Sequence, residues 1–130
     1  MTTNVWEIAS FTVIVAATAT VIMLPPGIAL AWLFARYRFP GRTALDTLVS
    51  LPLVIPPVAT GVILLRLFGR RGVFGGMLET AGVEVIFTWK AVVLAMAIMG
   101  LPLLVRAARA AFEQVDQRYE QIAATLGAGP

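Results

Sequence analysis

Apolar residues form three long runs along the chain, and short polar segments separate these runs. The runs cover residues 8–35, 45–68 and 86–105. A helix rises about 1.5 Å per residue, so about 20 apolar residues can cross the hydrocarbon core of a bilayer, which is about 30 Å thick. The pattern therefore predicts an all-α membrane protein with three transmembrane helices.

Prolines interrupt each of these runs. The first run contains the pair Pro25–Pro26, the third contains one proline, and the second contains three. Proline removes a backbone N–H and clashes with the preceding turn, so it bends or breaks a helix. Backbone groups freed at membrane depth must be satisfied by neighbouring helices or a water-lined cavity. We therefore predict a functional distortion that forms a pathway or a hinge, with the candidates Pro52, Pro56, Pro57, Thr60, Gly61 and Pro102.

A different pattern follows the third run, because apolar residues now recur every three or four positions. This spacing predicts an amphipathic helix from Ala107 to Leu126, and Gly127 stands where a helix commonly ends. The other face of this helix carries carboxylates, among them Glu113 and Glu120. An anionic membrane surface would repel these groups. We therefore favour a docking helix for a protein partner over a helix that lies on the membrane.

Composition supports a membrane protein and narrows the chemistry. Of the 130 residues, 59% are hydrophobic and 13% are charged, whereas soluble domains are about half apolar and about a quarter charged. The absence of cysteine and histidine removes the usual thiolate, imidazole and zinc chemistry. The ten Lys and Arg are spread over short loops and form no basic stripe. We expect no enzyme activity, no metal, no cofactor and no nucleic-acid partner.

Basic residues are distributed unevenly about the three predicted spans. Six arginines fall on the side that holds the tail, and four basic residues fall on the other side. Cytoplasmic loops carry an excess of Lys and Arg, so we predict that the N-terminus lies outside and the tail lies in the cytoplasm. A cleaved signal peptide is the alternative for the first run, but no basic residue precedes this run and it is too long.

Two stretches of the tail, Phe112–Asp116 and Gln121–Ala128, resemble the cytoplasmic signature loop of permeases from ATP-binding-cassette (ABC) importers. In that loop, a glycine follows a Glu-Ala-Ala sequence at a fixed spacing. Gly127 matches this glycine, which places Gln121 at the position of the glutamate. The match is therefore partial.

Other stretches resemble the molybdate-type permeases in particular, and the similarity covers nearly all 130 residues. The sulfate and thiosulfate permeases share the Leu-Pro and Val-Arg elements but lack the Ile-Pro-Pro run. The resemblance implies an importer of molybdate or tungstate, and the alternatives are a sulfate or thiosulfate importer, or a small structural membrane subunit that does not transport. The similar stretches are Leu51–Val58, Leu67–Arg70, Phe87–Trp89 and Leu101–Arg106.

The resemblance also implies an incomplete type I ABC importer permease fold, in which residues 1–130 form one domain and residues 107–130 form a coupling segment. Such permeases continue past this loop with further spans, so we expect a fragment or a remainder that is encoded separately. The implied partners are a cytoplasmic ATPase, a periplasmic oxyanion-binding protein, a second permease copy and the lipid of a bacterial inner membrane. The residues expected to dock on the ATPase are Tyr119, Glu120, Gln121, Ala123, Ala124, Leu126 and Gly127.

Overall fold

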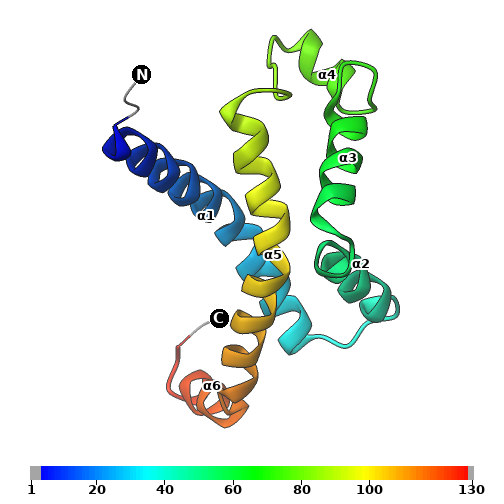
Figure 1. The fold of residues 1–130 in the computed structure, drawn as a ribbon. Helices are drawn as coiled ribbons and strands as arrows, with labels where there is room; N and C mark the ends of the chain where they lie inside the picture. Colours follow the sequence, from blue (N-terminus) through cyan, green and yellow to red (C-terminus); the bar gives the residue numbers. More distant parts are fainter. Residues whose placement is uncertain (1–3, 129–130) are drawn as a thin grey trace.

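The computed structural model describes residues 4–128, and every regular element in this range is a helix. Residues 1–3, at the start of the chain, and residues 129–130, at the end of the predicted coupling segment, lie outside the described residues. Figure 1 shows an open arrangement in which two long helices cross and the remaining helices flank them. The helices are α1 (Val5–Arg36), α2 (Arg42–Val54), α3 (Pro57–Phe68), α4 (Gly75–Thr80), α5 (Trp89–Gln114) and α6 (Gln117–Thr125).

The packing of α1 against α5 forms the core of the molecule. Near the start of both helices, a buried cluster joins Val15 and Ala19 of α1 to residues of the first turns of α5. Near their other ends, a second cluster joins Ala31 and Phe34 to Val105. The first half of α1 thus packs on the first half of α5, and the second halves pack likewise, so the two helices run in the same direction. Helices α2 and α3, which lie between them in the sequence, return the chain to the start of α5 (Figure 1).

Glycines allow α1 and α5 to approach closely between the two clusters. A Cβ atom at Gly27 would lie 2.5 Å from the Leu104 Cδ2 atom, and one at Gly100 would lie 3.0 Å from the Met23 sulfur. Lipid tails are as apolar as leucine, so membrane helices associate mainly through close packing, which small residues permit. Gly27 therefore provides the space that the Leu104 side chain fills.

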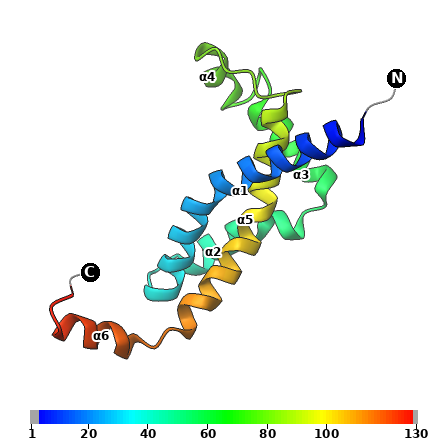
Figure 2. The ribbon, with the colours of Figure 1, turned by 90° about the vertical axis from the view of Figure 1, so that its left-hand side faces the viewer.

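The three proline sites have different effects on the backbone. Helix α1 continues through Pro25–Pro26, and Figure 2 shows that it changes direction along its length. Helix α5 continues through Pro102, whose side chain is fully buried. The second apolar run, in contrast, is broken: α2 and α3 meet at an angle of 114°. The expectation of one irregular helix over residues 45–68 is thus replaced by two separate helices.

Local proline chemistry explains this break. The backbone of Ile55 is extended, with φ of −75° and ψ of 133°, as expected for a residue that precedes a proline. Pro56 is the N-cap of α3 and Pro57 is its first residue, where the missing N–H costs no helical hydrogen bond. The Pro-Pro pair therefore ends one helix and starts the next.

The tail also differs from the predicted single helix over Ala107–Leu126. Helix α5 extends to Gln114, and α6 starts after a break at Val115 and Asp116. Asp116 causes the new start, because its carboxylate accepts a 3.0 Å hydrogen bond from the N–H of Arg118 and caps α6.

The predicted end of the tail helix at Gly127 is confirmed. Gly127 has a φ of +84°, which is the left-handed conformation that glycine adopts readily. The N–H of Ala128 donates to the Ala123 carbonyl over 3.0 Å, and the N–H of Gly127 donates to the Ala124 carbonyl over 3.1 Å. These two bonds form a Schellman motif, which satisfies the last carbonyl groups of the helix.

Helices α1 and α5 are each long and apolar enough to cross a membrane, and the bent pair α2–α3 is a third span if it is counted as one. Large apolar side chains on these helices are exposed, including Val13 and Val21 of α1 and Val58 and Val62 of α3. Exposed apolar surface of this extent is typical of a membrane or partner interface. The helical structure and the apolar spans agree with the predicted fold class.

We predict that Gly27→Leu destabilises the contact between α1 and α5 by about 1–3 kcal/mol, the usual cost of overpacking a filled core. Thermal unfolding of the purified full-length protein in detergent measures this effect. Gly61→Leu is the matched control, because a Cβ at Gly61 meets no atom within 4 Å. An equal loss of stability in both variants would contradict the prediction.

Candidate functional site

Charged side chains gather where α1 and α5 end and α2 begins, close to α6. We call this region the polar end of the structure. Each helix reaches it at the edge of an apolar run, so long polar side chains extend from an apolar body. Two of the three ion pairs of this region join residues that are far apart in the chain, and the third lies within α5. The pairs involve Arg36, Asp46, Arg109, Glu113 and Glu120.

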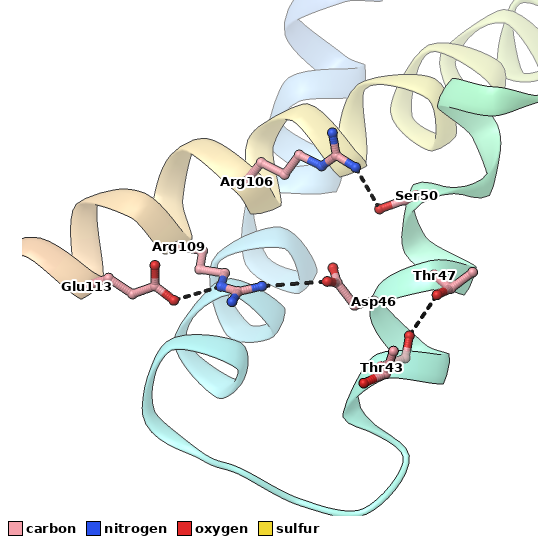
Figure 3. Close-up of polar contacts among 7 residues, drawn as sticks. All are labelled: Thr43, Asp46, Thr47, Ser50, Arg106, Arg109 and Glu113. Carbon is pink, nitrogen blue, oxygen red and sulfur yellow. Dashed lines mark hydrogen bonds and ion pairs between the residues drawn. The ribbon is translucent and has the colours of Figure 1, made fainter.

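Arg109 links α5 to α2. Its Nε atom lies 2.8 Å from the Glu113 Oε1 atom, and its Nη1 atom lies 3.6 Å from the Asp46 Oδ2 atom (Figure 3). Glu113 is four residues further along the same helix, a spacing at which side chains meet. The guanidinium thus connects the end of α5 to the first turns of α2.

Arg106 makes a second link between these helices. Its Nη2 atom donates a 3.2 Å hydrogen bond to the Ser50 hydroxyl (Figure 3). Leu45 and Val49 of α2 pack beside it on the apolar cluster that α1 and α5 share. Helix α2 is therefore held against α5 by apolar packing and by two arginines one turn apart.

The end of α1 is linked to α6. The Arg36 guanidinium forms an ion pair with the carboxylate of Glu120. Only 13% of the Arg36 side chain is exposed, whereas 59% of the Glu120 side chain is exposed. This pair connects residues that are 84 positions apart in the sequence.

Helix α6 presents an uncovered apolar stripe. Tyr119, Ile122 and Leu126 recur at intervals of three and four, and their exposed fractions are 71%, 55% and 82%. Val115, just before the helix, continues the stripe and is also exposed. None of the residues of α6 is buried. A short helix with caps at both ends and a free apolar face is suited to insert into a groove of another protein.

The structure places the seven predicted docking residues on or directly after α6, but they do not share one face. Tyr119 and Leu126 belong to the apolar stripe. Gln121 and Ala124 are also exposed, while Ala123 is partly buried. Gly127 ends the helix. Glu120 differs from the others, because its carboxylate is turned to Arg36.

The predicted pathway and hinge residues fall into two groups. Pro52, Pro56 and Pro57 surround the bend between α2 and α3. One turn after the bend, Thr60 is buried, and its hydroxyl donates a 3.4 Å hydrogen bond to the carbonyl of Pro56. Gly61 lines a largely apolar cavity of 630 Å³ between α3 and α5. Pro102 lies on a different helix, α5.

Sequence reasoning missed the ion pairs of the polar end. It used Arg36 and Arg109 as markers of membrane orientation, because their partners on other helices, Glu120 and Asp46, are far away in the sequence. A usable signal was present in the sequence: Asp46 lies near the start of the second apolar run, just after the loop that follows Arg36, and Glu120 lies in the tail that follows Arg109. Charges at the edge of a membrane span often pair with one another. Within residues 4–128, no group of three or more acidic, cysteine or histidine side chains is arranged to hold a metal ion.

The comparison with protein families now identifies the class of this chain. The family described as binding-protein-dependent transport system inner membrane component matches residues 27–130, and the chain belongs to this family. Its members are membrane components of transport systems, so the predicted resemblance to ABC importer permeases and the predicted permease fold are confirmed.

Comparison with individual relatives gives more specific matches than the family does. The chain is 46% identical over 125 residues to the molybdenum transport system permease protein ModB of Escherichia coli K12, covering 95% of this chain and 55% of that protein. It is 44% identical over 115 residues to ModB of Mycobacterium tuberculosis, with 88% and 44% covered. It is 37% identical over 128 residues to the sulfate transport system permease protein CysT of Salmonella typhimurium, with 97% and 46% covered. The chain thus spans about half the length of these relatives.

We predict a measurable coupling between Arg109 and Asp46. Arg109→Gln and Asp46→Asn each remove the charge attraction between α5 and α2, and Arg109→Gln also removes the pair with Glu113. The double variant therefore loses little more than Arg109→Gln alone. Both side chains are partly exposed, so the coupling free energy is about 0.5 kcal/mol. A double-mutant cycle on thermal unfolding in detergent measures it, and full additivity of the two single effects would contradict the link.

Proposed function

We propose that this chain is the N-terminal part of the membrane-spanning permease subunit of an ATP-driven importer of molybdate or tungstate. Membership of the transport family supports the permease role. The molybdenum permease relatives, at 43–46% identity in several bacteria, support the substrate. The observation that carries the proposal is α6, a capped helix with a free apolar stripe in the part of the chain that resembles the signature loop.

In this proposal, α6 is the coupling helix and docks in a groove of the cytoplasmic ATPase. The stripe of Tyr119, Ile122 and Leu126 supplies apolar contacts, and the Schellman motif at Gly127 keeps the end of the helix compact. Closure of an ATPase dimer then moves α6 as a rigid body and rocks the spans attached to it. The ATPase would hydrolyse ATP, and this chain would not.

The bend between α2 and α3 is the part of the pathway that we assign to this chain. Broken helices in transporters expose helix ends and backbone groups near the substrate, and the 114° bend at Pro56–Pro57 creates such a break. Thr60 and Gly61 follow it by one turn. A second permease copy would complete the pathway, and a periplasmic binding protein would deliver the oxyanion to the side opposite the polar end.

In this proposal, the N-terminus lies outside and α6 lies in the cytoplasm. The polar end holds Arg36, Arg106 and Arg109, and these residues agree with the excess of basic residues on the cytoplasmic side. The permease subunit of this proposal is a multi-pass protein of a bacterial inner membrane.

A sulfate or thiosulfate importer is the second candidate, because a sulfate permease relative aligns with 97% of the chain at 37% identity. Molybdate and sulfate are both tetrahedral dianions, so the residues described above do not by themselves discriminate between them. The higher identity to the molybdenum permeases favours molybdate.

We expect molybdate, and not sulfate, to stimulate ATP hydrolysis by the complete importer. The measurement uses full-length permease, its ATPase and its binding protein in proteoliposomes, with each oxyanion supplied on the binding-protein side. Stimulation by sulfate alone would contradict the substrate assignment and would leave the permease role intact.

We expect Ile122→Asp to abolish association of the full-length permease with its ATPase, because a carboxylate in the middle of the apolar stripe opposes burial in an apolar groove. Co-purification from detergent measures association. Gln117→Asp is the matched control, since it adds the same charge in the first turn of α6, away from the stripe. Retained association of Ile122→Asp would contradict the docking role of α6.

A further inference from the structure

Helix α6 is joined to the spans at two points. The first is covalent: Val115 and Asp116 connect it to α5 with extended backbone, φ and ψ being −76° and 116° for Val115 and −64° and 124° for Asp116. The second is the ion pair between Arg36 and Glu120. Because no residue of α6 is fully buried, packing contributes little to holding the helix in place, and a two-residue link alone would let it swing.

The surroundings of Arg36 make Glu120 its necessary partner. Arg36 is the last residue of α1, and its side chain lies beside a hollow of 380 Å³ next to Phe112 and the link residue Val115. Its Nε atom is buried and has no hydrogen-bond partner among the described residues. A guanidinium that is mostly removed from water requires a compensating charge. The nearby carboxylate of Glu113 is engaged by Arg109, and that of Asp116 accepts from the N–H of Arg118. Glu120 therefore supplies the charge.

Glu120 directly precedes Gln121 in the sequence. The resemblance to the signature loop places the family's glutamate at Gln121, and the acidic side chain of this chain stands one position earlier. One residue on a helix rotates the side chain by about 100°, and here this carboxylate is turned to α1. The carboxylate of Glu120 thus contacts another helix of the same chain.

We propose that Arg36 and Glu120 form a positioning pair that fixes α6 to α1, so that movement of α6 reaches α1 and α5 together. This proposal rests on the proposed role of α6 as the coupling helix. Helices α1 and α5 already pack as one body around Gly27 and Leu104. With α6 tied to α5 by the chain and to α1 by the ion pair, the three helices form one rigid unit.

The test uses the complete importer in proteoliposomes and measures oxyanion transported per ATP hydrolysed. We expect Arg36→Gln and Glu120→Gln to retain ATPase association but to lower this ratio by about fivefold or more, because α6 moves without carrying α1. The exchanged pair, Arg36→Glu with Glu120→Arg, restores most of the loss. Arg38→Gln is the control, since Arg38 is exposed and makes no ion pair within residues 4–128.

Three results would overturn the positioning role. The ratio could be unchanged in both single variants, the exchanged pair could stay as low as the single variants, or the single variants could lose ATPase association, which would place the pair in the docking surface itself. Failure of the unaltered permease to bind an ATPase would instead refute the proposed function.

A second measurement does not depend on transport. Spin labels at Arg38→Cys and Thr125→Cys of the full-length permease report the distance between the end of α1 and the far end of α6, and residues 1–130 contribute no native cysteine to interfere. We expect Glu120→Gln to broaden the distance distribution, and an unchanged narrow distribution would overturn the proposal.

Discussion

The close approach of α1 and α5 is the contact on which the other parts of the structure depend. Gly27 admits the Leu104 side chain at the crossing, and buried clusters on both sides of this point hold the helices in register. Helix α2 is attached to this pair through Arg106 and Arg109, and α6 is attached through Arg36. The membrane environment makes this dependence strong, because apolar side chains gain little by leaving lipid and only close packing discriminates one arrangement from another.

The two Pro-Pro pairs show what sequence reasoning can and cannot predict. Both were recognisable as sites of distortion, yet α1 continues through Pro25–Pro26 whereas the chain breaks at Pro56–Pro57. The difference lies in the surroundings. Gly27 and Ala31, which follow the first pair, are buried against α5. Val54 and Val58, on the two sides of the second pair, are exposed, and only Thr60, one turn later, is buried in α3. Packing keeps one helix continuous, and a propensity rule contains no information on packing.

The tail shows a second limit of prediction from the sequence. Apolar spacing continues from α5 across Val115 into α6, so periodicity alone indicated a single helix from Ala107 to Leu126. The break depends on one side chain, Asp116, whose carboxylate caps α6. Gly127 was predictable because the left-handed conformation strongly favours glycine, whereas the contact between Arg36 and Glu120 depends on the tertiary path of the chain and left no local pattern.

The length of α1 has a consequence for the membrane itself. Its 32 residues extend about 48 Å, well beyond a hydrocarbon core of about 30 Å, so the helix tilts or bends to match the bilayer. Its change of direction in Figure 2 meets part of this mismatch. Because α5 is packed along α1 and α6 is attached to both, a thicker or thinner bilayer would tilt all three helices together. The position of α6 relative to the bilayer is therefore sensitive to lipid chain length, and with it the geometry of any docking through α6 as proposed above.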